Sequence, residues 1–147
     1  MRRRARQLAA QAAASGDPAG WFETLYAEAR DGQAVVPWDD RQPNPHLTQW
    51  AKTAAERGIA GPGRRALVVG CGVGGDPAFL AGLGCQVTAF DVSLTAIAEA
   101  KERFRDEPVD YQVADLLAPP PRTIEQFLDD EAPPKLRWRA EFTRPAA

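Results

Sequence analysis

The stretch of this sequence best suited to binding a ligand is a glycine cluster, at Gly70, Gly72, Gly74 and Gly75. An apolar, partly β-branched run at 67–69 precedes it, as is typical of the end of a buried parallel strand. Glycines let the backbone turn sharply and leave no side chain to block a ligand. We expect Asp76 to cap a following helix with Pro77 at its first position. A strand, a glycine turn and a helix N-terminus together predict a site for a nucleotide-like group.

The spacing of the glycines fits two patterns. Gly70, Gly72 and Gly75 satisfy the dinucleotide-binding G-x-G-x-x-G. Asp91 then lies about twenty residues further on, where a ribose-binding carboxylate is expected. Gly70, Gly72 and Gly74 equally satisfy G-x-G-x-G. The glycines alone therefore leave open whether the ligand is NAD or another adenosyl compound.

Two helices are predicted before the glycine turn. Asp17 and Pro18 indicate the start of the first helix, and Asp31 with Gly32 ends it. Its helical spacing creates one aromatic face, made of Trp21, Phe22, Leu25, Tyr26 and Ala29. A proline-rich loop with an exposed Trp38 leads to a second helix, 47–58.

Strands and helices alternate around the turn. We expect strands at 67–69, 86–90 and 109–113, with one helix up to Gly84 and another capped by Ser93. Asp91 and Asp115 then stand at the ends of the second and third strands. This order predicts an α/β fold, a Rossmann-like doubly wound parallel sheet.

Composition limits the partners of the chain. Its 147 residues suit one domain, and a net charge of −2 gives no electrostatic case for binding nucleic acid. No apolar run approaches a membrane span, so neither nucleic acid nor a membrane is expected as a partner. Cys71 and Cys85 are too few and too far apart for a metal cluster or a disulfide framework. We expect reduced thiols in a cytoplasmic protein and no metal.

Residues 1–16 form a basic, alanine-rich N-terminal arm. Its arginines are Arg2, Arg3, Arg4 and Arg6. The segment resembles a helical arm more than a secretory signal, and we expect it to be solvated and frayed.

Three motifs resemble the successive S-adenosylmethionine-binding motifs of class I methyltransferases. They are VGCGVGGD at 69–76, VTAFDVS at 87–93 and VADL at 113–116. Upstream, WFETLY at 21–26 and PWD at 37–39 are similar to the entry region of the thiopurine and thiol/halide methyltransferase branch. In that branch a proline often stands where Val69 is.

The resemblance implies a cofactor, S-adenosylmethionine, and a small-molecule methyl acceptor. The residues it assigns to the cofactor are Gly70, Cys71, Gly72, Gly74, Asp91, Val92, Asp115, Leu116, Trp21 and Trp38. The glycine backbone would pass close to the methionine part and the ribose. Trp21, Trp38 and Tyr26 would form a lid over the sulfonium, because aromatic rings attract cations. For Trp21 and Tyr26 the equal alternative is that they are core residues of an amphipathic helix. No catalytic residue is assigned, and the lone His46 is expected at the surface.

The carboxylates have distinct implied roles. Asp91 would accept hydrogen bonds from both ribose hydroxyls, since one carboxylate has the geometry for both. Asp115 would accept from the adenine exocyclic amine. Val92 and Leu116 would lie on either side of the base.

The resemblance implies one shortened domain, 17–147, that lacks the middle of the family's sheet after the third strand. It would comprise a helical lid at 17–60, a cofactor-binding unit at 64–118 and a closing antiparallel hairpin at 122–147. The first strand would then expose an apolar edge, which predicts a homodimer or other oligomer. Methyl transfer to a small molecule is the expected function. A cofactor-binding but catalytically degenerate regulatory or structural protein and an NAD-binding fragment are the alternatives.

Overall fold

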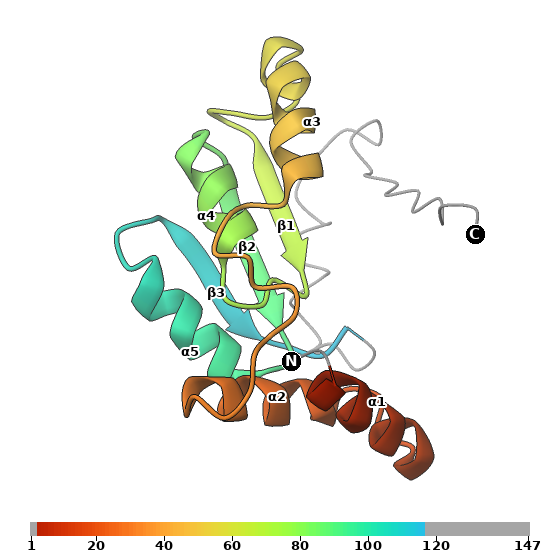
Figure 1. Ribbon diagram of the computed structural model, residues 1–147. Helices are drawn as coiled ribbons and strands as arrows, with labels where there is room; N and C mark the ends of the chain where they lie inside the picture. Colours follow the sequence, from red (N-terminus) through yellow and green to blue (C-terminus); the bar gives the residue numbers. More distant parts are fainter. Residues whose placement is uncertain (1–2, 117–147) are drawn as a thin grey trace, which may run out of the picture.

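Three parallel strands form the sheet of the computed structural model, which describes residues 3–116 (Figure 1). They are β1 (Arg65–Val69), β2 (Gln86–Asp91) and β3 (Val109–Val113), in the order β1-β2-β3. The register places Val69 opposite Phe90, and Asp91 opposite Val113. The predicted parallel α/β sheet is confirmed, whereas the predicted hairpin at 122–147 lies outside the described residues.

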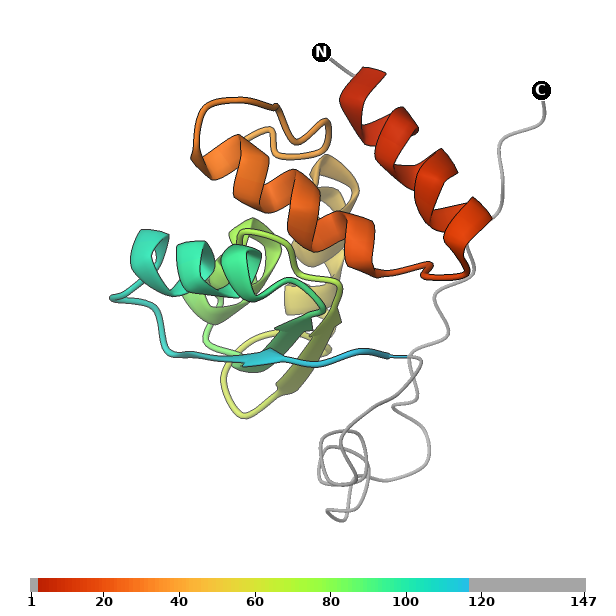
Figure 2. The same ribbon diagram turned by 90° about the horizontal axis from the view of Figure 1, so that it is seen from below.

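Two helices connect the strands and lie on the same side of the sheet (Figure 2). They are α4 (Gly75–Gly82) and α5 (Leu94–Arg103). Ile97 and Ala100 of α5 pack with Ala89 and Tyr111 of the sheet. Ser93 caps α5 as predicted, because its hydroxyl accepts a hydrogen bond from the Ala96 N–H at 3.0 Å.

Helix α3 (Pro45–Glu56) packs in a core cluster with α4 and the sheet, in which Ala54 lies with Leu80 and Val87. Its cap is Asn44, whose side chain accepts from the His46 N–H. The prediction that Asp76 caps α4 is wrong, since the cap position is Gly74 and no side chain bonds there. Asp76 instead accepts a hydrogen bond from the Asn44 N–H at 2.7 Å. The Asp76 carboxylate, which the local sequence pattern assigned to the N-terminus of α4, thus bonds instead to a backbone N–H 32 residues earlier in the chain.

The first two helices lie side by side beyond the C-terminal ends of the strands (Figures 1 and 2). They are α1 (Arg3–Ser15) and α2 (Gly20–Arg30). The prediction that Asp17 caps α2 with Pro18 at its first position is wrong, since the cap position is Ala19 and the helix begins at Gly20. The Asp17 carboxylate still accepts a hydrogen bond from the Gly20 N–H at 2.8 Å. The expected frayed arm is wrong, since Leu8 is buried and Arg4 pairs with Glu28 of α2. None of the helices within residues 3–116 combines the length and apolar character that a membrane span needs.

Glu23 fixes α2 to the N-terminus of α5. Its carboxylate accepts hydrogen bonds from the hydroxyls of Ser93 and Thr95, and from the Thr95 N–H at 3.1 Å. Burial by itself would raise the pKa of Glu23, but these hydrogen bonds outweigh it and lower the pKa below its ordinary value of 4.5. A negative charge beside the first N–H groups of a helix is also favourable for the helix dipole.

We expect Glu23→Gln to reduce the free energy of unfolding by about 1–2 kcal/mol at pH 7, because hydrogen bonds to a charged group are lost. A lowered pKa makes the carboxylate's contribution present above about pH 4.5 and lost as pH falls through the folded-state value. Urea unfolding followed by circular dichroism should therefore show the difference from wild type shrinking between about pH 5 and pH 3. The exposed Glu56→Gln is the matched control. An equal effect of both variants at every pH would contradict the role of Glu23.

Candidate cofactor site

A cavity of about 320 Å³ lies where the three strands end. Its lining comes from the ends of β1, β2 and β3 and from the region of α2. The lining residues are Pro18, Ala19, Phe22, Tyr26, Trp38, Val69, Gly70, Phe90, Asp91, Val92, Ala114, Asp115 and Leu116. The carboxyl ends of parallel strands are the edge at which α/β sheets bind their ligands.

This cavity brings together most of the residues that the sequence predicted for the cofactor. Those lining it are Trp38, Gly70, Asp91, Val92, Asp115 and Leu116. The other predicted residues, Trp21, Cys71, Gly72 and Gly74, lie outside the lining. Sequence analysis did not assign Phe22 to the site. Its position one helical turn before Tyr26 was the signal that could have found it.

Asp91 is buried at the end of β2, with 6% of its surface exposed. One carboxylate oxygen accepts from the Gly72 N–H at 2.8 Å, and the other accepts from the Ser93 N–H at 2.9 Å. The carboxylate therefore ties the glycine turn to the turn that begins α5. Each carboxylate oxygen can accept a further hydrogen bond, since an ionised carboxylate has about four acceptor positions.

The glycines of the turn differ in what surrounds them. Gly70 has a φ of +65°, and a Cβ there would meet nothing within 4 Å, so its open side faces free space. A Cβ on Gly72 would come within 2.7 Å of the Tyr26 hydroxyl. A Cβ on Gly74 would come within 2.6 Å of the Tyr111 hydroxyl. Gly70 thus leaves room beside the cavity, whereas Gly72 and Gly74 permit close packing.

Aromatic side chains form one wall of the cavity. Trp38 is 46% exposed, and its indole N–H donates to the Tyr26 hydroxyl at 2.9 Å. The Trp38 ring meets Phe22 and Trp21 edge-on, with centroids 6.0 Å away in each case. Burial, followed by the charge of Asp91, raises the pKa of Tyr26 to about 12. The Tyr26 hydroxyl is therefore neutral at physiological pH.

Cys71 lies in the turn but does not face the cavity. Its N–H donates to the Phe90 carbonyl at 3.0 Å, which extends the pairing of β1 with β2. Burial, together with the nearby charge of Asp91, raises the pKa of the Cys71 thiol to about 12. A thiol with this pKa is protonated at neutral pH and is a poor nucleophile.

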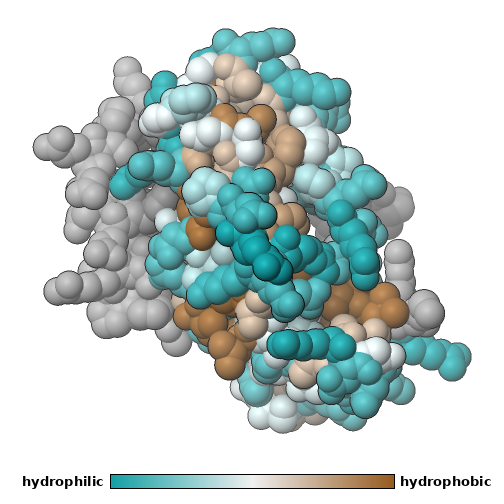
Figure 3. All heavy atoms as spheres, turned by 90° about the vertical axis from the view of Figure 1, so that its left-hand side faces the viewer, coloured by the Kyte–Doolittle hydropathy of each residue, from teal (hydrophilic) through white to brown (hydrophobic). Residues whose placement is uncertain are grey.

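A larger and more open groove, of about 550 Å³, lies between α5, the end of α2 and the loop before α3. Charged residues of both signs line it, including Arg30, Asp39, Glu99 and Arg103. Figure 3 views the side of the molecule that carries α5, and hydrophilic residues cover much of the middle of this face. No strand end contributes to the groove, and Val73 is the one residue of the glycine turn in its lining.

The smaller cavity fits an adenosyl ligand in its chemistry. Gly70 leaves a space that a Cβ would fill, beside a buried carboxylate with acceptor capacity. Apolar side chains of Val92 and Leu116 line the same cavity, and aromatic rings close one side. The residues present therefore suit a ribose, a flat base and a cationic sulfur together.

Comparison of the sequence with models of protein families finds a match. Residues 66–127 match the family model of the methyltransferase domain. Among curated proteins, none matches the sequence.

Three solved structures illustrate the likeness of the fold. One comes from work on the conversion of a disulfide bond into a thioacetal group during echinomycin biosynthesis, with 30% identity and a TM-score of 0.51 over 64% of this chain and 39% of that one. A TehB-like SAM-dependent methyltransferase from Corynebacterium glutamicum is 27% identical, with a TM-score of 0.36 over 50% of this chain and 47% of that one. Magnesium protoporphyrin IX methyltransferase from Synechocystis PCC 6803 with bound SAM is 22% identical, with a TM-score of 0.44 over 65% and 51%. This chain spans less than two thirds of the length of each.

The matched segment contains β1, the glycine turn, β2 and β3, which form one edge of the cavity. Residues 66–127 are therefore similar to a methyltransferase domain, the domain of a family whose cofactor is S-adenosylmethionine.

Proposed function

We propose that this chain transfers a methyl group from S-adenosylmethionine to a small-molecule acceptor. One observation carries the proposal, the cavity at the strand ends that combines Gly70, Asp91 and Asp115. The family match of residues 66–127 supports the choice of an adenosyl cofactor over NAD. The likeness of residues 21–50 to the thiopurine and thiol/halide branch stays a prediction.

Asp91 binds the ribose in this proposal. Its oxygens accept from the Gly72 and Ser93 N–H groups, which fixes the plane of the carboxylate, and their remaining lone pairs can accept from ribose hydroxyls. Asp115 accepts from the adenine amine, and Val92 and Leu116 lie on either side of the base. All four residues line one cavity, which supports these roles.

The cofactor supplies an electrophilic methyl group on a positively charged sulfur. The aromatic wall of Phe22, Tyr26 and Trp38 provides ring surfaces that attract such a cation. The chain contributes by positioning the reactants and excluding water. A route in which the Cys71 sulfur first takes the methyl group and then passes it on would need a thiolate. The protonated Cys71 thiol argues against this covalent route and supports direct transfer to the acceptor.

Cofactor binding without turnover is the second candidate, in which the chain acts as a regulatory or structural subunit. Binding and turnover are separate measurements, so the two candidates give different results. A chain that binds S-adenosylhomocysteine and methylates no thiol, halide or hydroxyl acceptor would support the second.

We also propose that the chain forms a homodimer or other oligomer. Within residues 3–116, β1 pairs with β2 on one side only, and Val69 at its end is 47% exposed. An apolar strand edge is a common place for a second chain to pair. Size-exclusion chromatography with light scattering should give a mass above that of one chain at micromolar concentration. A monomer under these conditions would refute the proposal.

Asp91→Asn should weaken binding of S-adenosylhomocysteine by about 10- to 100-fold in calorimetric titration, because charge-assisted hydrogen bonds to the ribose are lost. The exposed Asp110→Asn of β3, outside the cavity, should bind as wild type. Thermal unfolding of both variants shows whether the fold is kept. NAD titrated in parallel should bind more weakly than S-adenosylhomocysteine. Tighter binding of NAD, or unchanged affinity in Asp91→Asn, would overturn the assignment.

Cys71 should react slowly with iodoacetamide at pH 8. A pKa of about 12 instead of 9.0 lowers its thiolate fraction by about 1000-fold. The rate is measured in Cys85→Ala, where Cys71 is the one remaining cysteine of the sequence, with a small thiol peptide as the reference. Reaction at the rate of the peptide would mean that the turn stabilises a thiolate, and would reopen the covalent route.

A further inference from the structure

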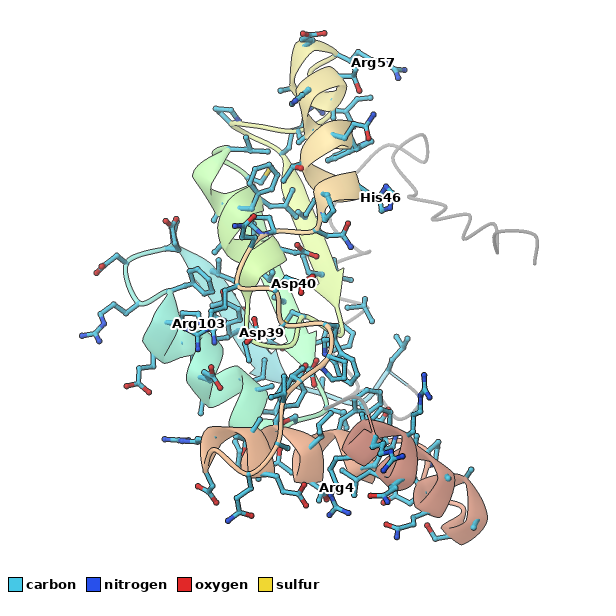
Figure 4. The ribbon with its side chains drawn as sticks, in the orientation of Figure 1. Arg4, Asp39, Asp40, His46, Arg57 and Arg103 are labelled. Carbon is cyan, nitrogen blue, oxygen red and sulfur yellow. The ribbon has the colours of Figure 1, made fainter. Side chains whose placement is uncertain are left out.

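An ion pair anchors the loop that carries Trp38. Asp39, the next residue along the chain, receives two hydrogen bonds from Arg103 at the end of α5, each 3.2 Å long and each to a different carboxylate oxygen. The pair joins residues 64 positions apart, and Figure 4 shows the two side chains together. Only 26% of the Arg103 side chain and 19% of the Asp39 side chain are exposed. A two-bond, partly buried pair of this kind fixes orientation as well as distance.

Besides this ion pair, the loop near Trp38 is held by Val36, which is buried in the core, and by the contacts of the Trp38 ring with Phe22 and Tyr26. It contains no helix or strand between α2 and α3. The Asp39 N–H donates to the Val36 carbonyl at 3.2 Å, and the Arg41 N–H donates to the Asp39 carboxylate at 3.1 Å. Trp38 itself is 46% exposed and makes one hydrogen bond, to Tyr26. The Asp39 carboxylate thus accepts the hydrogen bonds that tie the residues directly after Trp38 to α5.

Arg103 is also held in place from its own helix. Glu99, one turn earlier in α5, accepts a hydrogen bond from the same guanidinium. The opposite end of α5 begins beside Asp91, where the Ser93 N–H donates to that carboxylate. One helix therefore connects the ribose-binding end of the cavity with the anchor of the aromatic wall.

We propose that Arg103 is a positioning residue, which through Asp39 holds the Trp38 ring against the cofactor cavity. The expected consequence is tighter binding of the cofactor, because a ring held in place before binding loses less conformational entropy when the cofactor binds. This consequence rests on the proposed function. Arg103 lines the charged groove on the other side of the loop and is absent from the lining of the cofactor cavity. Its effect on the cofactor is therefore indirect and, in this proposal, passes through the loop.

The first test needs no ligand. Acrylamide quenching of tryptophan fluorescence is measured in wild type and in Arg103→Met, and Trp38→Phe in each background isolates the Trp38 signal among the four tryptophans. Quenching of Trp38 should rise about twofold in Arg103→Met, as expected for a released side chain. Exchange of the charges in the double variant Asp39→Arg, Arg103→Asp should restore part of the protection. Unchanged quenching would overturn the proposal.

Matched controls separate the anchor from general stability. Glu99→Gln removes the charge of the other partner of Arg103 and leaves the pair with Asp39 intact, so Trp38 quenching should stay as in wild type. Arg105→Met makes the same change at an exposed position two residues later. If Arg103→Met does not fold, Asp39→Asn replaces it. Equal quenching in Asp39→Asn and wild type would likewise overturn the proposal.

The second test is a double-mutant cycle on the affinity for S-adenosylhomocysteine. Arg103→Met should raise the Kd by about 2- to 10-fold, the range for ordering one side chain. Trp38→Phe should raise it by a similar factor, and the double variant should be no worse than Trp38→Phe alone. Independent, multiplying effects would contradict action through Trp38. If wild type does not bind S-adenosylhomocysteine, the proposed function fails, and the quenching result still decides whether Arg103 holds Trp38.

Discussion

The hydrogen bonds of the Asp91 carboxylate set the geometry on which the cavity depends. A carboxylate at this depth is costly unless its oxygens are bonded, and here each oxygen accepts a backbone N–H, one from the glycine turn and one from the start of α5. The two turns that follow β1 and β2 are therefore held against each other by one side chain. Because the third strand is paired with the second at Asp91 and Val113, the end of β3 follows the same arrangement. The shape of the cavity therefore depends on the hydrogen bonds of Asp91 and on the pairing of β2 with β3.

A second carboxylate, that of Glu23, fixes the helical layer above this edge. It accepts a hydrogen bond from the hydroxyl of Ser93, the same residue whose N–H bonds Asp91, so both acidic groups hold the turn that begins α5. Since Phe22 and Tyr26 lie on the same helix as Glu23, docking of α2 also places the aromatic wall. The contribution of Glu23 depends on its charge, so the layer is held less firmly in acid.

Local signals were sufficient to predict the sheet. The strands at 65–69, 86–91 and 109–113 and the cap at Ser93 follow from apolar runs and cap chemistry within a few residues. Two of the errors concern contacts between distant segments. Asp76 had the right type and position for a cap, but an amide 32 residues earlier binds it. Helix α1 (Arg3–Ser15) lies in the arm that was expected to fray, and it is held by the packing of Leu8 against α2. Neither partner is visible in the spacing of the sequence.

The residues that line the candidate site were predicted in part, and the residues that were not predicted explain how the cavity is held together. Asp91, Asp115 and Gly70 follow strand ends, where the fold itself gathers ligand-binding groups. Glu23 and Arg103 carry no such signal, because a charged residue on an exposed helix face is usually only solvated.

The glycines of one sequence pattern also have different roles in the structure. Gly70 leaves open space, whereas Gly72 and Gly74 make room for the hydroxyls of Tyr26 and Tyr111. An alanine at Gly74 would therefore strain the packing of the turn against α5 and β3, while one at Gly70 would occupy the open space beside the cavity and meet a positive φ. One glycine pattern thus contains a position that leaves space for a ligand and two positions that permit close packing within the fold. The residues around each glycine in the structure show which role it has.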